Sequence, residues 1–147
     1  MPNGEQIRKM NQFSGCSRFV FNRALAYQNE QYEKDKSFKF SYAKLANMLP
    51  EWKREFPWLK ECHSQVLQQS LKDLEKSFRN FFDKRSNFPK FKRKGLKESF
   101  RFPQHYKLEQ GNSRIYLPKI GWVRYRNSRN VVGNIRNITV SYKCGRW

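Results

Sequence analysis

Residues 64–97 read SQVLQQSLKDLEKSFRNFFDKRSNFPKFKRKGLK, a helical pattern that continues directly into a basic loop. In its first part, apolar side chains recur at intervals of three and four residues, as on the buried face of an amphipathic helix. This pattern predicts a helix that starts near Ser64 and packs against a core. The apolar residues are Leu67, Leu71, Leu74, Phe78 and Phe81.

Polar side chains occupy the other faces of this predicted helix. Amides can contact the edges of bases and cations can neutralise phosphates, so these faces are candidates for contact with nucleic acid. The alternative is that such glutamines are simply solvated. The polar residues are Gln65, Gln68, Gln69, Lys72, Lys76 and Arg79.

The loop that follows is dense in positive charge and contains two aromatic residues. Basic residues interleaved with aromatics are typical of a nucleic-acid-binding surface. Phe88 and Phe91 can stack on unpaired bases, or they can pin the loop to the core, and the sequence leaves both open. The basic residues around them, with no acid among them, are Lys84, Arg85, Lys90, Lys92, Arg93, Lys94 and Lys97.

The chain has 147 residues, of which 16% are aromatic, enough for one ordinary domain or two small lobes. It contains no apolar run of about 18 residues and no signal-peptide pattern, so we expect a soluble, cytoplasmic protein. Cys16, Cys62 and Cys144 form no CxxC or Cys/His cluster. We therefore expect reduced thiols, with neither a disulfide framework nor a zinc site.

The net charge of +19 is unevenly distributed. Residues 84–147 hold 17 Lys or Arg against only Glu98 and Glu109, a net charge of +15, whereas residues 1–83 carry +4. A field of this strength favours polyanions and costs stability through self-repulsion when nothing neutralises it. A basic surface that serves only solubility is the alternative.

Helical patterns fill the first half of the chain. Asn3 can cap a long helix from about Glu5 to Lys34, in which Gln6 completes a capping box. Ser41 begins a second helical pattern, which Pro50 is predicted to interrupt or restart. With the helix near Ser64, residues 1–85 are predicted to form a lobe of three to four helices.

After Gly95 the apolar period changes from helical to two, which indicates strands. The alternation is clear in residues 99–102 and 114–117, and β signal continues through 122–126 and 135–142. Turn residues at 110–112, Gly121 and 133–134 separate these segments. The fold class is therefore α+β, with about five short strands in a small, incomplete β-barrel-like domain over residues 98–147. Residues 86–97 form the linker.

Little in the sequence suggests catalysis. His63 and His105 are the only imidazoles, and neither has a carboxylate or cysteine at metal-ligand spacing. There is no phosphate-binding GxxxxGK[ST] loop, no GxSxG and no acidic cluster of the two-metal nuclease kind. Intrahelical ion pairs, such as Glu75 with Arg79, explain the acids of the third helix. We expect no catalytic residue, metal or cofactor in this chain.

Six blocks, in order and spanning nearly the whole chain, strongly resemble the TnpB (OrfB) family. The family comprises insertion-sequence proteins, known as transposases and understood as RNA-guided DNA nucleases. The blocks are SRFVFNRALA (17–26), FPWLKE (56–61), SQVLQQSLKDLEKSFRNFF (64–82), FPKFKRKG (88–95), SFRFP (99–103) and LPKIGWVRYR (117–126).

The resemblance implies a helical recognition lobe, often labelled helix-turn-helix, and a wedge-like β-barrel, which together bind guide RNA and a target-adjacent DNA motif. It implies a bacterial, nucleoid-associated location and two sets of binding residues. The DNA-reading positions are Tyr42, Ser64, Gln65, Gln68 and Gln104. The positions that contact the RNA or heteroduplex backbone are Lys90, Lys92, Arg93, Lys94, Arg101, Arg124 and Arg126.

Two departures from the family pattern shape the expectation. Met1 and Pro2 stand where a first barrel strand should already have ended. The family's RuvC nuclease half and its Cys₄ zinc ribbon would follow Trp147. We therefore expect a module that binds nucleic acid without cutting it. The alternatives are one half of a split endonuclease, completed by a separate RuvC chain, and a non-functional remnant.

Overall fold

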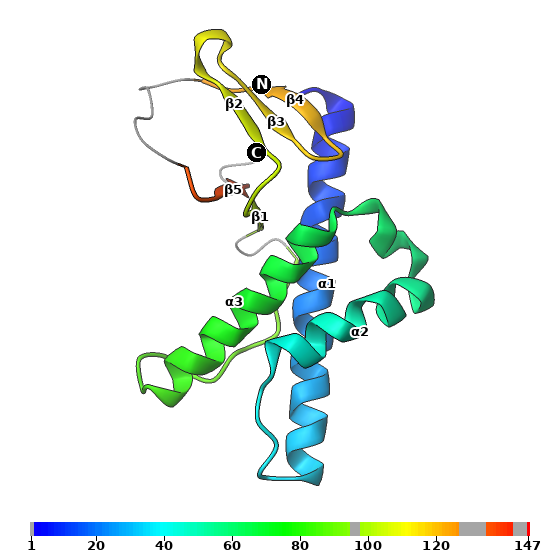
Figure 1. Cartoon of the computed structure of the whole chain (residues 1–147), viewed down its shortest axis with the longest axis vertical. Helices are drawn as coiled ribbons and strands as arrows, with labels where there is room; N and C mark the ends of the chain where they lie inside the picture. The colour runs from blue at the N-terminus through cyan, green and yellow to red at the C-terminus, as the bar shows by residue number, and fades with distance from the viewer. Residues whose placement is uncertain (1, 95–97, 127–134, 143–146) are drawn as a thin grey trace.

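The computed structural model describes residues 2–94, 98–126, 135–142 and 147, and it confirms the α+β class (Figure 1). Three α-helices precede five short strands within these residues. The helical elements are α1 (Gly4–Lys34), α2 (Tyr42–Glu55), the 3₁₀ helix η1 (Pro57–Glu61), α3 (Ser64–Phe82) and the 3₁₀ helix η2 (Gln110–Asn112). The strands are β1 (Ser99–Phe102), β2 (Lys107–Glu109), β3 (Arg114–Leu117), β4 (Gly121–Arg124) and β5 (Ile138–Ser141).

The long helix α1 starts with the predicted capping box. The Asn3 side chain accepts a hydrogen bond from the Gln6 N–H at 2.9 Å, and the Gln6 Oε1 accepts from the Asn3 N–H at 3.0 Å. The Gln6 amide also donates to the Trp122 carbonyl at 2.7 Å. The cap therefore ties the start of α1 to β4 as well as ordering its first turn.

Helix α2 corrects the prediction for Pro50, which lies inside a continuous helix. A proline in a helix interior removes one hydrogen bond and costs about 3 kcal/mol. Leu45 and Leu49 before it and Trp52 after it are all buried on one face. Packing on both sides of the proline thus holds the helix together, and α2 ends only at Glu55, before η1.

Helix α3 begins at Ser64, as predicted, and four of the five stripe residues are buried, with Phe81 half-buried. The buried face is wider than predicted because α3 packs against both α1 and β1. The Ser70 hydroxyl donates to the Ser17 carbonyl of α1 at 2.6 Å. Gln69 is also buried, with 9% of its surface exposed, so its predicted outward position is wrong.

The strands form two separate antiparallel sheets. β1 pairs with β5 in a register that aligns Phe100 with Val140, and β3 lies between β2 and β4. Phe100 and Phe102 of β1 are buried and pack around Phe13 of α1. The predicted barrel-like closure is not seen between the described strands, which instead attach separately to α1. The turn predicted at residues 133–134 lies outside the described residues.

Two of the cysteines, distant in sequence, meet in the core. Cys16 of α1 and Cys62, just after η1, are both free and buried, and their thiols are hydrogen-bonded. Burial raises the pKa of the Cys62 thiol, which favours the neutral form. These two cysteines are therefore buried core residues with free thiols, as predicted, and Cys144 lies outside the described residues.

Helix α3 ends in a Schellman motif with an unusual residue. The Arg85 N–H donates to the Asn80 carbonyl at 2.8 Å and the Lys84 N–H to the Phe81 carbonyl at 3.0 Å. Lys84 has a φ of 62°, in the left-handed region where glycine is usual at this position. The backbone of the cap at the start of the basic loop is therefore strained.

Lys84→Gly should relieve this strain. We expect the free energy of unfolding to rise by about 0.5–1 kcal/mol, because glycine adopts positive φ freely although it adds entropy to the unfolded chain. Urea denaturation, with an unchanged slope, measures the gain. Lys84→Ala keeps the strained backbone and serves as the control. Equal stability of the two variants would contradict strain at this cap.

Candidate nucleic-acid interface

Three of the predicted DNA-reading residues, Tyr42, Ser64 and Gln68, lie on α2 and α3 near the contacts between the two helices. Ser64 and Gln68 are one turn apart on α3, followed by Lys72, and α2 lies alongside. The Lys53 ammonium of α2 donates to the Ser64 hydroxyl at 2.7 Å, and the Lys72 ammonium lies 5.4 Å from the ring centroid of Tyr42. We call these five residues the α2/α3 face: Tyr42, Lys53, Ser64, Gln68 and Lys72.

The two glutamines at this end of α3 differ in their surroundings. Gln68 is half-buried and makes no side-chain hydrogen bond to another described residue. The Oε1 of Gln65 is buried without a hydrogen-bond partner among the described residues. Gln68 therefore presents its amide to a ligand more readily than Gln65 does.

Basic side chains from four segments, two lysines and two histidines, surround the first turn of α3. His63 caps the helix by accepting the Gln65 N–H on Nδ1 at 3.3 Å, and its ring centroid lies 6.1 Å from that of His105. Lys119, in the turn between β3 and β4, donates to the Lys60 carbonyl at 2.8 Å. We call this group the cationic cluster: Lys53, His63, His105 and Lys119.

Electrostatics in the cationic cluster are unfavourable without an anion. Burial, and then the charges of Lys119, His105 and Lys53, lower the pKa of His63. Burial and the charge of Lys119 likewise lower the pKa of Lys53. A bound phosphate would relieve this repulsion and restore part of the lost hydration.

The backbone of the cationic cluster is also strained. His105 and Lys119 have φ values of 68° and 66°, which side-chain-bearing residues rarely adopt. Lys119 follows Pro118 in a turn closed by the Ile120 N–H bonding to the Leu117 carbonyl at 3.0 Å, where a type II turn favours glycine. The Pro118–Lys119 pair indicates this turn in the sequence, but the turn and its lysine were not among the predicted features.

Gln104 lies in the exposed loop between β1 and β2, directly before His105. Because His105 contacts His63, this loop reaches the first turn of α3. The structure thus brings Gln104 to the same corner of the molecule as Ser64. The predicted reading positions come from two distant parts of the chain.

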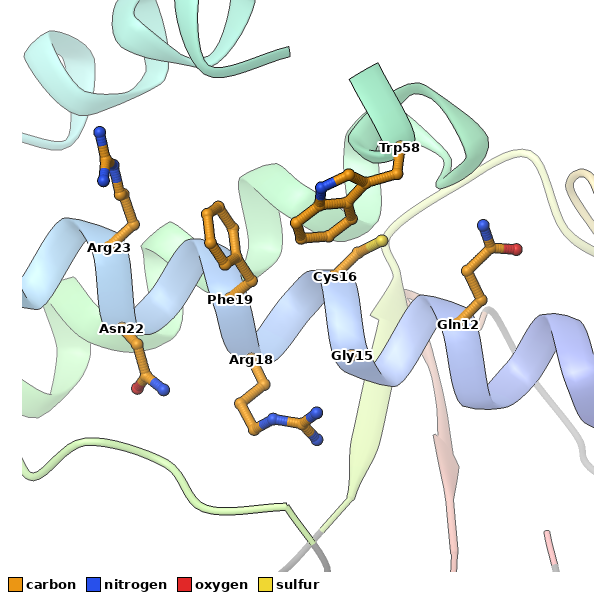
Figure 2. Close-up of a pocket in the computed structure, with 8 residues that line it drawn as sticks. All are labelled: Gln12, Gly15, Cys16, Arg18, Phe19, Asn22, Arg23 and Trp58. Atoms are coloured by element: carbon orange, nitrogen blue, oxygen red, sulfur yellow. The ribbon is translucent and has the colours of Figure 1, made fainter. Parts of the chain in front are cut away.

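The basic loop is fixed to α1 through its backbone. Asn22 accepts a hydrogen bond from the Lys92 N–H at 2.7 Å and donates to the Lys92 carbonyl at 2.9 Å. Arg18 forms an ion pair of 2.7 Å with Glu98 at the far end of the loop. Figure 2 shows Arg18 and Asn22 on one side of α1, opposite Phe19. The loop backbone is therefore anchored at two points, while Lys90, Arg93 and Lys94 are exposed.

Lys92 and Phe88 hold the same loop through their side chains. The Lys92 ammonium lies 4.5 Å from the ring centroid of Phe21, and burial lowers its pKa although the residue as a whole remains exposed. Phe88 makes edge-on contacts with Phe78 and Phe81, at centroid distances of 5.5 and 5.2 Å. The pinning alternative thus describes Phe88, which is still 45% exposed.

Arg101 joins β1 to α3. Its guanidinium forms an ion pair of 2.6 Å with Asp73 and donates from Nε to the Gln69 Oε1 at 3.1 Å. Asp73 is therefore paired across elements, whereas the predicted intrahelical pair of Glu75 with Arg79 is present at 3.5 Å. A contact between Arg101 and nucleic acid stays a prediction, beside this structural one.

The three-stranded sheet presents an aromatic and basic face. Lys107, Tyr116 and Trp122 form one cross-strand row, with 5.6 Å between the centroids of the two rings. Arg114 pairs across the sheet with Arg124, and its guanidinium lies 4.4 Å from the Trp122 ring centroid. We call these five residues the sheet face. Arg124 and, just beyond β4, Arg126 are exposed as predicted.

The described residues form neither a metal site nor a membrane-spanning helix. No group of three or more His, Cys, Asp or Glu side chains in the described ranges is arranged to hold a metal ion. Among the same residues, every helix is too short or too polar to span a bilayer.

Comparison with known proteins identifies the family of the chain. A family model for the helix-turn-helix domain of OrfB proteins of the IS605 kind matches residues 1–37. The chain is 55% identical over 148 residues to an Escherichia coli (strain K12) protein named "Putative RNA-guided DNA endonuclease InsQ". The chain belongs to the TnpB (OrfB) family. The resemblance of its six sequence blocks to TnpB is therefore confirmed.

The matches cover unequal shares of the proteins compared. The InsQ alignment covers 99% of this chain and 37% of InsQ, an N-terminal portion. A Streptomyces pristinaespiralis protein named "Putative RNA-guided DNA endonuclease" is 37% identical over 62% of this chain and 23% of its own length. "Virulence protein VsdF" of Salmonella dublin is 32% identical over 63% of this chain and 87% of its own length.

The part of the chain matched by the helix-turn-helix model contains one helix, α1, and the start of the following loop. The Asn22 and Arg18 anchors of the basic loop fall within it. The α2/α3 face lies outside the match. The matched segment therefore holds the basic loop in place but contains no residue of the α2/α3 face, the cationic cluster or the sheet face.

The lowered pKa of His63 predicts acid sensitivity. The folded protein holds His63 neutral more strongly than the unfolded chain does, so the unfolded state binds more protons below about pH 6.5. Stability contributed by His63 is complete above that pH and is lost as the pH falls. We expect the loss between pH 7.5 and 5.5 to be smaller in His63→Asn, which keeps a capping side chain.

Thermal melts of both proteins across this pH range measure the difference. Polyanion binding at the cationic cluster should raise the pKa of His63 and so be favoured by acid. If wild type and His63→Asn lose stability identically as the pH falls, protonation of His63 does not affect folding and the prediction is wrong.

Proposed function

We propose that this chain binds guide-type RNA and target-adjacent duplex DNA as the recognition portion of a TnpB-like protein. The single observation that carries the proposal is the convergence of the α2/α3 face, the cationic cluster and the Gln104 loop at one corner. An amide, a hydroxyl and a phenol lie there among cations. This combination suits base edges flanked by phosphates.

A division of labour follows from the geometry. A base-reading side chain must be held in place, and Gln68 and Tyr42 are half-buried on packed helices. A backbone contact needs only a reachable charge, and Lys90, Arg93, Lys94, Arg124 and Arg126 are exposed cations on an anchored loop and a sheet edge. We therefore assign sequence discrimination to the α2/α3 face and general affinity to the basic loop and sheet face.

Cleavage is not part of the proposed role. The chain spans 37% of the length of InsQ, and the endonuclease activity in that relative's name belongs to that protein. We propose that the residues present here bind and position nucleic acid, and that cutting by a TnpB-like protein depends on a RuvC nuclease half. Metal-dependent cleavage by the purified chain alone would overturn this part of the proposal.

Gln68→Ala should reduce discrimination between DNA sequences. A lost bidentate contact to a base costs about 1–3 kcal/mol for the preferred sequence only, so preferred and scrambled duplexes should approach each other in affinity. Fluorescence anisotropy with both duplexes and with structured RNA measures the change. RNA affinity should stay nearly unchanged.

The matched control is Gln12→Ala, which removes an exposed glutamine of α1 away from the α2/α3 face. It should leave all affinities as they are. An equal loss of affinity for every ligand in Gln68→Ala would show that Gln68 does not read bases.

Arg124→Ala and Arg101→Ala should behave differently. Arg124 is exposed, so its loss should weaken binding equally for all sequences and lower the salt slope by about 1, with little effect on folding. Arg101 joins β1 to α3, so its loss should lower the free energy of unfolding by about 1–2 kcal/mol. Salt titrations and urea denaturation distinguish the two, and a destabilised Arg124→Ala would argue against the assignment.

A further inference from the structure

A large aromatic groove lies at the C-terminal end of α3, away from the cationic cluster at its first turn, and includes Phe88 of the basic loop. It has a volume of about 820 Å³ and is formed by the C-terminal part of α1, the loop between α1 and α2, and the end of α3. Six phenylalanines and Tyr32 line it. Its size falls within the range of about 300–1,000 Å³ typical of small-molecule sites.

Several of these aromatic rings have much of their surface exposed to solvent instead of packed in the core. Phe82 is 70% exposed, Tyr32 48% and Phe88 45%. Phe82 is supported from below by Phe78, whose ring is nearly parallel at 23° with a centroid distance of 6.4 Å. It also contacts Phe81 edge-on at 5.3 Å. Phe82 is therefore held by its neighbours while most of its surface remains open to a ligand.

The rim of the groove is cationic. Lys36, Lys39 and Arg79 border it, against the single acid Glu75, which is paired with Arg79. The Lys36 ammonium lies 4.7 Å from the Tyr32 ring centroid. Phe88 belongs both to the groove and to the basic loop, so positive charge continues from the rim along the chain. The occupant that this surface fits carries negative charge and flat apolar groups together.

We propose that the aromatic groove binds unpaired nucleobases of a single-stranded segment, with Phe82 as the stacking platform and Lys36, Lys39 and Arg79 facing the phosphates. Base-on-ring stacking tolerates any base, because each has a π-face, and it works together with nearby cations. The inference rests on the proposed function, since it assigns the unpaired part of the same nucleic acid to a separate site. The single strand comes from the bound RNA or from an opened DNA duplex.

The test uses the purified full chain and four probes. They are an RNA hairpin with blunt ends, the same hairpin with a single-stranded extension carrying 2-aminopurine, and the two DNA counterparts. Wild type should bind the extended form of at least one pair more tightly than the blunt form and should quench its 2-aminopurine. The better extension identifies RNA or DNA as the source of the strand.

Substitutions at Phe82 separate stacking from simple apolar contact. Phe82→Ala should lose about fivefold or more in affinity for the extended probe, the lower end of what one stacked base contributes, with the blunt probe unaffected. Phe82→Tyr should retain the affinity, and Phe82→Leu should lose it because leucine lacks a flat π-face. Ile7→Ala, which removes an exposed apolar side chain at the other end of α1, should change nothing.

Each contrary result has a definite meaning. Equal wild-type affinity for blunt and extended probes, or equal losses for both in Phe82→Ala, overturns the groove inference and leaves the proposed function standing. Unchanged affinity of Phe82→Leu for the extended probe overturns stacking on Phe82, because leucine has no flat π-face. Failure of wild type to bind any of the four probes overturns the proposed function itself. If Phe82→Ala melts early, Tyr32→Ala on the opposite wall takes its place.

Discussion

The burial of α3 between α1 and β1 is the constraint on which the other surfaces depend. Ser70 bonds to the backbone of α1 on one side, and Asp73 with Gln69 holds Arg101 of β1 on the other. These contacts fix the rotation of α3 about its axis. One helical face becomes core, and Gln68 lies half-buried between Ser64 and Lys72 on another face. A polar row can read bases only when its helix cannot turn, so the proposed base-reading role of this face depends on the packing of the other.

A neutral side chain, Asn22, holds the backbone of the basic loop in place. Its two hydrogen bonds add no negative charge near the lysines. An acidic anchor would hold the loop as well but would also occupy the cations. The few acids present mostly complete internal ion pairs, as Glu98 does with Arg18. The outward-facing cations therefore remain available to a polyanion.

The sequence predicted the elements with strong periodicity and missed what depends on contacts between them. The start of α3 and the capping box at Asn3 follow from local rules, and both are confirmed. The continuity of α2 through Pro50 depends on burial by distant residues, which no local pattern reveals. Likewise, Gln69 looked outward on a helical wheel because β1, its partner element, lies about thirty residues further along the chain.

Strain and exposed aromatic surface occur at the positively charged ends of α3. Lys84 follows its last turn and Lys119 approaches its first, both with a left-handed backbone that glycine would adopt more easily. At the C-terminal end, Phe82, the last residue of α3, keeps 70% of its surface exposed. Each feature costs stability in the free chain, and the proposed function gives each a role with a ligand bound. On this proposal, helix α3 links two sites of different chemistry, a polar corner suited to paired bases and an aromatic groove suited to unpaired ones, some 19 residues apart along one rigid element.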